Sequence, residues 1–220
     1  MFTRTDARWL ESSSDRSAAG TIKRRAAYSL AAMAAAGSTE AAVIYSGTQN
    51  ISIAQFNSLN LDIDGDTQGD LLLKNYVFGG GNYQGATVNF FPGKMVTFTS
   101  GTSVNNYVTA LNAGFTVEAS ALGNFTGSMA YGAANPNAQF NSASGKFIGL
   151  QFPSGTNNYN AWVRVDVNNT AGSFNVADWA YENVPGVGIV TGVVPEPVSS
   201  LGLLAAGAVG VAVLRRRRTS

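Results

Sequence analysis

Short runs of apolar residues, separated by stretches rich in turn-forming residues, occupy the middle of the chain. Valine, isoleucine, phenylalanine, tyrosine and tryptophan fill the runs, and glycine, asparagine, serine and threonine fill the stretches between them. No run keeps the helical period of ~3.6 residues for long, so the pattern predicts strands. We expect them near residues 43–46, 50–55, 58–63, 71–78, 86–91, 94–99, 114–119, 146–152, 159–168, 173–182 and 187–191. This part of the chain is therefore predicted to be all-β.

Alternation of polarity is clearest towards the end of this region. Val163, Val165 and Val167 are separated by polar or aromatic residues, which places the three valines on one face of a strand. Apolar side chains at every second position from Ile148 to Phe152 share a face in the same way. Many short strands with frequent turn signals are typical of a single β-sandwich or jelly-roll domain.

The N-terminal residues have the pattern of an export signal. Three basic residues at 23–25 precede a short, alanine-rich apolar run at 26–37, and small residues follow it. This order predicts a signal peptide with an extended N-region over residues 1–42, which signal peptidase removes after Ala41 or Ala42.

The C-terminal residues combine a polar tripeptide, an apolar segment and a basic end. The tripeptide is Pro195-Glu196-Pro197, residues 198–214 carry no charge, and Arg215, Arg216, Arg217 and Arg218 follow. At ~1.5 Å per residue the apolar segment is roughly 25 Å long, enough for one transmembrane helix with some thinning of the bilayer. The arginines resist transfer through lipid and hold this end on the cytoplasmic side.

This three-part tail resembles the PEP-CTERM sorting signal of Gram-negative bacteria. The resemblance implies that an exosortase, a membrane-embedded cysteine transpeptidase, cuts an inner-membrane intermediate at the tripeptide and passes the protein to the cell surface. Residues 146–152, 159–165 and 178–182 also resemble a block found in many exosortase-sorted proteins. A plain tail anchor is the alternative. The expected organisation is a signal peptide (1–42), a β-sandwich domain (43–185), a linker (186–194) and the sorting signal (195–220).

The expected mature region is acidic and lacks two reactive residue types. Residues 43–194 hold four basic and eight acidic residues, a net charge of −4, because the other basic residues lie in the two ends. No basic stripe remains, so nucleic acid is not an expected partner. The sequence has no cysteine, which excludes disulfides and thiol chemistry, and no histidine, the commonest general base and zinc ligand.

One acidic stretch between two expected strands has the spacing of a cation site. Its carboxylates stand at relative positions 1, 3, 5 and 9: Asp62, Asp64, Asp66 and Asp70. They resemble the Asp-x-Asp-x-Asp-Gly-x-x-Asp loops that bind Ca²⁺, in which alternate acids converge on a cation with about six to eight oxygen ligands. The EF-hand pattern fails because Leu73 replaces its final glutamate, and Thr67 stands where glycine is usual, so a left-handed bend there is strained. We expect a structural Ca²⁺ site; the alternative is a solvated acidic turn.

Large aromatic residues lie on the last strands: Trp162, Trp179 and Tyr181. If exposed together, they would form a platform on which sugar rings stack; the alternative is that they fill the core. Arg164 is expected to pair with Asp178 or Glu182 on a neighbouring strand, in a structural role.

No spacing of residues singles out a catalytic site. Glu118, Asp166, Asp178 and Glu182 offer carboxylates of the kind that glycosidases use, but scattered acids on any sandwich would do so. The glycine run at 79–81 lacks the lysine and the helix of a phosphate loop and predicts a turn. An enzyme is not expected.

Taken together, these patterns predict an exported, exosortase-processed protein of the cell surface or of an extracellular polysaccharide (biofilm) matrix, with a structural or adhesive β-sandwich. A Ca²⁺-dependent carbohydrate-binding module is the first alternative, and a glycosidase-type enzyme is the second.

Overall fold

The computed structural model describes residues 41–100 and 105–195. Four predicted features lie wholly or partly outside the described residues: residues 1–40 of the signal peptide predicted over 1–42, Glu196 and Pro197 of the tripeptide, the transmembrane segment 198–214 and the arginines at 215–218. Within the described ranges, no helix is long and apolar enough to cross a membrane.

Strands dominate the described part of the chain. They are β1 (Val43–Tyr45), β2 (Ile51–Ile53), β3 (Asn57–Leu61), β4 (Leu71–Phe78), β5 (Gly81–Val88), β6 (Lys94–Met95), β7 (Thr97–Thr99), β8 (Asn106–Val108), β9 (Thr116–Val117), β10 (Thr126–Ala130), β11 (Ser142–Ser154), β12 (Asn157–Asn168), β13 (Ser173–Glu182) and β14 (Ile189–Val190). Two single-turn 3₁₀ helices, η1 (Ala119–Ala121) and η2 (Gly132–Ala134), complete the described elements. The predicted all-β fold is confirmed.

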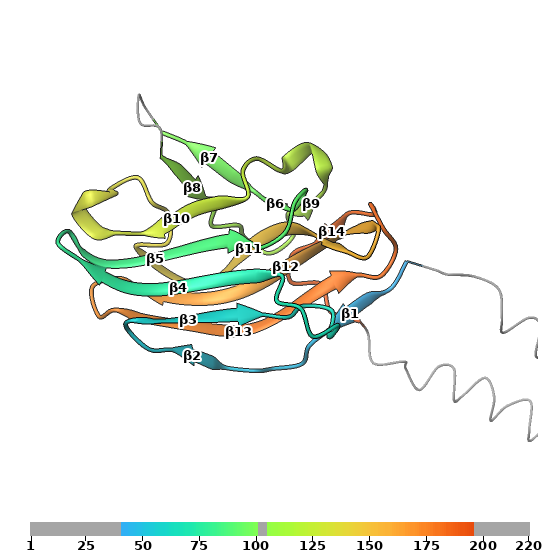
Figure 1. The fold of residues 1–220 in the computed structure, drawn as a ribbon, viewed down its shortest axis with the longest axis horizontal. Helices are drawn as coiled ribbons and strands as arrows, with labels where there is room; N and C mark the ends of the chain where they lie inside the picture. The colour runs from blue at the N-terminus through green and yellow to red at the C-terminus, as the bar shows by residue number, and fades with distance from the viewer. Residues whose placement is uncertain (1–40, 101–104, 196–220) are drawn as a thin grey trace, which may run out of the picture. The chain divides into compact units, whose positions relative to one another are not determined.

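These strands form two six-stranded sheets and one two-stranded sheet. The first has the order β1-β13-β12-β11-β6, with β2 also paired to β13; the second has the order β3-β4-β5-β10-β8-β7; the third pairs β14 with β9. Among the described strands, β8 and β10 run parallel and the other neighbours run antiparallel. The two larger sheets lie in two layers (Figure 1) and enclose one main core, as in a β-sandwich.

The chain passes between the two larger sheets at both of their edges. Strand β2 belongs to the first sheet and is followed, after residues 54–56, by β3 of the second sheet. At the opposite edge, Val96 alone separates β6 of the first sheet from β7 of the second. Short covalent crossings therefore tie the edges of the sandwich together.

Alternate residues of β12 belong to two different cores. Val163, Val165 and Val167 face the main core between the larger sheets, as predicted, and so do Ile148, Leu150 and Phe152 of β11. Trp162 faces the other way into a second core, whose other members are Val96, Leu111, Val117, Phe147, Ala180 and Ile189. Val117 and Ile189 come from the small β9–β14 sheet, so this sheet covers the outer face of the first sheet.

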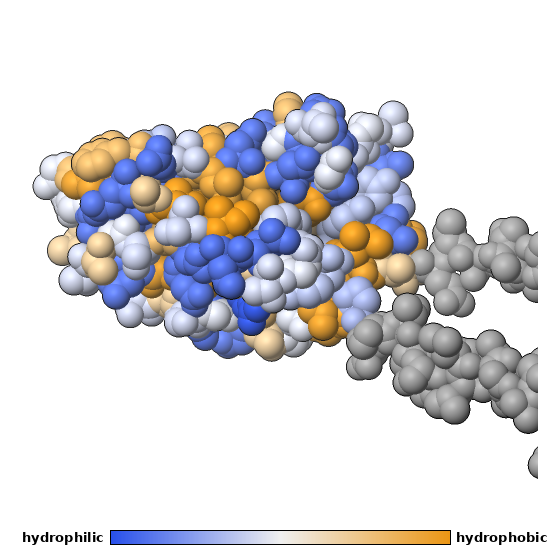
Figure 2. Space-filling model, turned by 90° about the horizontal axis from the view of Figure 1, so that it is seen from below, coloured by the Kyte–Doolittle hydropathy of each residue, from blue (hydrophilic) through white to orange (hydrophobic). Residues whose placement is uncertain are grey.

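Figure 2 shows the side of the domain that carries the edge strands β2 and β3. Hydrophobic surface there forms separate patches between hydrophilic ones, without one continuous apolar face. Both edge strands are also short, at three and five residues. Short edge strands limit pairing with strands of other chains.

Several boundaries differ from the sequence prediction. Strands β8 and β10 were not expected, the strand expected at 86–91 begins at Gly81, and the one expected at 94–99 is split at Val96. The expected linker 186–194 is wrong in part, because Ile189 and Thr191 within it are 2% and 1% exposed and Ile189 pairs with Val117. The domain therefore extends beyond residue 185 to Thr191. The glycine run does form a turn, since Phe78 pairs with Gly81 across it.

Candidate functional site

The acidic stretch forms the loop that joins β3 to β4. Leu61 and Leu71 are paired across the two strands, and the N–H of Asp70 donates to the carbonyl of Leu61 at 2.8 Å, so the loop is closed at its base. Asp62, Asp64 and Asp70 each offer a carboxylate oxygen, and these oxygens lie within 4.8 Å of one another. The structure thus brings three of the four predicted ligands together, in a loop between two β-strands as expected.

Backbone N–H groups hold the loop in this shape. Asp62 accepts hydrogen bonds from Gly65 at 2.7 Å and from Thr67 at 2.9 Å, as a carboxylate does in an Asx-type turn. The fourth predicted ligand, Asp66, accepts from the N–H of Gln68 at 2.7 Å and is not part of the converging group. Thr67 has a φ of 76°, the left-handed conformation that strains a β-branched residue.

Asp70 is the buried member of the acidic group, with 2% of its surface exposed. The pKa of the Asp70 carboxyl is raised to about 7, mainly by burial and also by the charges of Asp64, Asp66 and Asp62, although the hydrogen bond from the Ile63 N–H acts to lower it. A buried carboxylate beside other carboxylates is stabilised by a proton or by a cation. Either a proton on Asp70 or a cation at the three carboxylates would therefore stabilise the folded loop.

Two of the three predicted platform residues lie beside this loop. The indole N–H of Trp179 donates to the carbonyl of Ile63 at 3.2 Å, which ties β13 to the loop. Trp179 and Tyr181 are both half-buried and pack against the main core. Burial raises the pKa of Tyr181, and the charge of Asp64 adds to the rise. The ring of Tyr181 also lies 5.9 Å from that of Phe152, edge to face.

Trp162 does not join the other two aromatic residues. It is 1% exposed, and it pairs with Ala180 in the register that places Trp179 and Tyr181 on the opposite face of the sheet. Its ring lies 5.2 Å from Phe147 in the second core. The three residues therefore cannot form one sugar-stacking platform, and the alternative of a core residue holds for Trp162.

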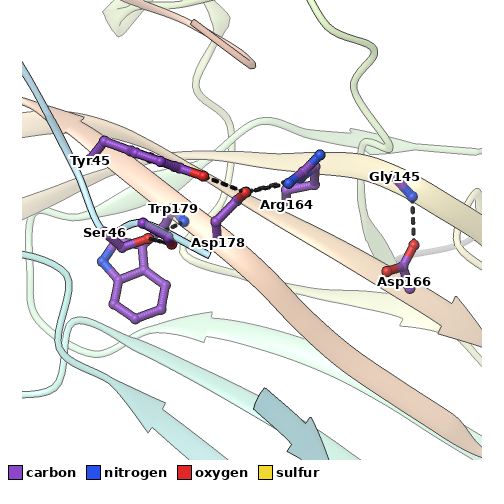
Figure 3. Close-up of polar contacts among 8 residues, drawn as sticks. Tyr45, Ser46, Gly145, Arg164, Asp166, Asp178 and Trp179 are labelled. Carbon is purple, nitrogen blue, oxygen red and sulfur yellow. Dashed lines mark hydrogen bonds and ion pairs between the residues drawn. The ribbon is translucent and has the colours of Figure 1, made fainter. Parts of the chain in front are cut away.

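The predicted cross-strand ion pair forms between Arg164 and Asp178 (Figure 3). The Nε of Arg164 donates to Oδ1 of Asp178 at 2.9 Å, and the Nη2 of Arg164 contacts Oδ2. The hydroxyl of Tyr45 donates to the same Oδ2 at 2.8 Å. The hydrogen bond to Asp178 raises the pKa of Arg164. Trp179, the next residue on β13, donates its backbone N–H to the hydroxyl of Ser46 at 2.9 Å. These contacts fix β1 against β13 and β12.

The other carboxylates considered for catalysis have local partners. Asp166 accepts from the hydroxyl of Ser144 at 2.6 Å and from the N–H of Gly145 at 2.7 Å, across the register shift in β11 (Figure 3). Glu118 accepts from the hydroxyl of Ser120 at 2.8 Å, and Glu182, 4% exposed, accepts from a backbone N–H two residues on at 3.2 Å.

A network of buried amides near the other end of β4 was missed by the sequence analysis. Asn75 donates to the carbonyls of Ile53 and Gly172 at 2.8 and 2.9 Å and accepts from Gln84 at 2.8 Å. Gln84 in turn accepts from Asn169 at 2.8 Å. The network joins β4 and β5 of the second sheet to β2 and to the β12–β13 turn of the first. Asparagine counted only as a turn-forming residue in the sequence, and nothing in the spacing of these amides indicated burial.

The described residues thus define an all-β double-sheet domain with an acidic loop suited to a hard cation. A comparison of the chain with protein-family models, curated proteins and solved structures finds no match. Its function therefore has to be argued from the sequence signals and from the geometry described above.

Proposed function

We propose that the chain is an exported, exosortase-processed PEP-CTERM protein of a Gram-negative bacterium. In this proposal, the β-sandwich is a structural or adhesive component of the cell surface or of an extracellular polysaccharide matrix. Signal peptidase and exosortase are its processing enzymes, and the C-terminal helix holds it in the inner membrane until processing.

The order of tripeptide, apolar segment and arginines carries this proposal. The uncharged apolar segment anchors the end of the chain in the bilayer, and the four arginines stop transfer of the chain across the membrane. The tripeptide then stands at the outer boundary of the membrane, within reach of a transpeptidase. A tail anchor alone needs no Pro195-Glu196-Pro197 at that boundary.

The boundaries of the folded domain support both processing steps. Strand β1 begins at Val43, directly after the predicted signal-peptide cleavage sites. Ala42 and Asn183 exchange hydrogen bonds of 2.9 and 3.1 Å, which cleavage after Ala41 leaves in place. At the other end, Thr191 is buried and residues 192–195 are exposed. Both described ends lie at the same end of the domain (Figure 1). Neither cut removes part of a sheet, because the first strand begins at Val43 and the last ends at Val190.

The geometry of the acidic loop is an argument for a structural Ca²⁺ site in the same protein. Asp62, Asp64 and Asp70 supply clustered oxygens, the ligands that a hard cation takes. Bound Ca²⁺ would fix the β3–β4 connection and, through Ile63, the position of Trp179 on the first sheet. In the alternative, a Ca²⁺-dependent carbohydrate-binding module, only Trp179 and Tyr181 could contact a sugar, because Trp162 is buried on the opposite face of the sheet.

Processing in a host with the matching exosortase tests the proposal. Replacing the tripeptide (Pro195→Ala, Glu196→Ala, Pro197→Ala) should trap an uncut form in the inner membrane. Replacing Arg215 to Arg218 with serine should let the C-terminal end move through the membrane, and processing should therefore decrease. Fractionation followed by immunoblotting measures both effects.

A matched control changes the residues directly before the tripeptide. Val193→Ala with Val194→Ala alters two side chains that are 47% and 44% exposed, so it should leave folding and processing intact. Equal processing of the tripeptide variant and of this control would refute the exosortase proposal and leave a plain anchor.

A further inference from the structure

A groove of about 420 Å³ crosses the outer face of the second sheet. Its lining residues come from β5, β8, β10 and the segment around η2, and they include Tyr83, Asn106, Thr126, Ser128, Tyr131 and Asn135. Neighbours of these residues on the strands, such as Gln84 and Met129, are fully buried on the inner side, so alternate side chains face the groove. The volume falls in the range of ~300–1,000 Å³ that small-molecule sites occupy.

Two tyrosines form the aromatic wall of the groove. The rings of Tyr83 and Tyr131 lie 5.5 Å apart at 86°, and the ring of Phe78, a 53% exposed residue, lies 5.5 and 6.2 Å from them. Tyr83 and Tyr131 are half-buried and Phe78 is exposed, so these rings give the groove a partly exposed aromatic edge. Tyrosine suits a binding surface because its ring is apolar and its hydroxyl group is polar.

Glycines on β5 and in the preceding turn leave room for both rings. A Cβ atom on Gly85 would lie 2.4 Å from the hydroxyl oxygen of Tyr83, so that ring leans along its own strand over Gly85. A Cβ on Gly80 would lie 2.9 Å from the Tyr131 ring, and the N–H of Gly80 donates to the Tyr131 hydroxyl at 3.2 Å. The aromatic wall is therefore held in place by its neighbours.

The rest of the lining consists of amides and hydroxyl groups. Asn135 donates to the hydroxyl of Ser128 at 2.9 Å, and Thr126 shares a hydrogen bond of 3.0 Å with Thr87. No acidic or basic side chain of the described residues lines the groove. Neutral donors and acceptors beside aromatic rings match a sugar, whose hydroxyl groups bond to amides while its C–H face packs on a ring. The lining itself offers an acidic glycan no cation to offset its charge, and the nearby ammonium of Lys74 is already bound to Thr87, the partner of Thr126, at 3.3 Å.

We infer that this groove binds a neutral oligosaccharide, such as a segment of a neutral polysaccharide chain. The site lies on the second sheet, apart from the residues Trp162, Trp179 and Tyr181 that the sequence suggested for sugar stacking. It does not use the acidic loop, so its binding does not require Ca²⁺. The inference goes beyond the sorting proposal and does not depend on it, because an uncut chain carries the same groove.

Glycan binding by the full chain tests this inference. The protein is purified in a polyoxyethylene detergent, because a sugar-headed detergent would compete for the groove. It is then applied, in EDTA, to immobilised neutral glycans (β-1,3-, β-1,4- and α-1,6-glucans, mannan and galactan) and to the acidic glycans alginate and polygalacturonate. We expect retention on at least one neutral glycan and none on the acidic ones. Retention on none of the neutral glycans, or on acidic glycans alone, would overturn the inference.

Two variants assign any binding to the groove. Tyr83→Ala should weaken binding roughly tenfold or more, since it removes one stacking ring. Phe56→Ala is the matched control, because Phe56 is a 68% exposed aromatic residue in the β2–β3 connection that does not line the groove, and the variant should bind as the unchanged protein does. Equal binding by the Tyr83→Ala and Phe56→Ala variants would contradict the assignment.

A third variant keeps the test valid if Tyr83→Ala does not fold. Tyr131→Ala removes the facing ring from a loop after β10 and should cause a similar loss of binding. Circular dichroism and thermal unfolding establish that each variant is folded. Binding that survives in a folded Tyr131→Ala variant, or that appears only when Ca²⁺ is added, would place sugar recognition outside this groove and refute the inference.

Discussion

The two ends of strand β4 connect the sheets of the sandwich with opposite chemistry. Before Leu71, the acidic loop gathers three carboxylates, and it contacts the first sheet through the packing of Ile63 in the main core and an indole hydrogen bond from Trp179. Near the other end, Asn75 joins a set of buried neutral amides that satisfy one another. An amide side chain carries both hydrogen-bond donors and an acceptor, so buried amides can satisfy one another. Clustered carboxylates repel one another unless a proton or a cation reduces their charge. We therefore expect the amide end to be stable without ions and the acidic end to depend on pH and on a bound cation.

The largest expected effect is at the amide end. Asn75→Ala leaves the carbonyls of Ile53 and Gly172 and the side chain of Gln84 without their partner, in a site that water does not reach. Each unsatisfied buried group costs roughly 1–3 kcal/mol, so the variant should lose roughly 3–9 kcal/mol of unfolding free energy. Denaturant unfolding at pH 5 and at pH 8 should give the same loss.

Asn57→Ala is the matched control for that loss. Asn57 lies opposite Asn75 on β3 and is exposed, so its replacement should change the unfolding free energy by less than about 0.5 kcal/mol. A similar, small loss in both variants would show that the amide network does not hold the sheets together.

A pH dependence is expected at the acidic end, in the presence of a chelator. The pKa of Asp70 is raised to about 7 in the folded chain, so between about pH 4 and pH 7 the folded chain keeps a proton that the unfolded chain has released. The contribution of Asp70 to stability is therefore fully present below about pH 4 and is lost as the pH rises through about 7. The slope is at most ~1.4 kcal/mol per pH unit.

Asp70→Asn sharpens this prediction because it removes the titrating group. The variant should lack the part of the slope between about pH 4 and pH 7 that the unchanged protein shows, as measured by denaturant unfolding across that range. Parallel pH profiles for the two proteins would contradict the protonation of Asp70.

The smallest of the three stability effects is the gain from Ca²⁺. A ligand that binds only the folded chain stabilises it by ~2.7 kcal/mol at a hundredfold excess over its Kd. Asp64→Ala should abolish this gain, whereas Asp66→Ala should keep most of it, because Asp66 lies outside the converging group. The gain should also be larger at pH 8 than at pH 5, since the cation replaces the proton on Asp70. A melting temperature that is the same in chelator and in millimolar Ca²⁺ would contradict the Ca²⁺ site and favour the alternative, a solvated acidic turn.

The sequence predicted the regular strands and missed those that depend on their neighbours. Val163, Val165 and Val167 mark a face of β12 by alternation alone, so that face could be predicted. Residues 126–130 have no such pattern, and they form β10 because β5 and β8 flank them on both sides. Strands were expected at 114–119 and 187–191, where β9 and β14 lie, but nothing in the sequence indicated that they pair with each other and cover Trp162.

The acidic loop was predictable in its place and in its chemistry, and less so in its ligands. Spacing identified the four acids and the two strands around them, but spacing does not determine which carboxylates converge, and Asp66 lies outside the converging group. The groove on the second sheet had no sequence signal. Tyr83 and Tyr131 are 48 positions apart and meet only because β5 and β10 pair.

The account rests most on the export and processing of this domain, and the intact mass of the surface-extracted protein tests that directly. It predicts a chain that begins at Ala42 or Val43 and lacks everything beyond Pro195-Glu196-Pro197, apart from any group that the transpeptidase adds there. A surface form whose mass still includes residues 198–220 would contradict it.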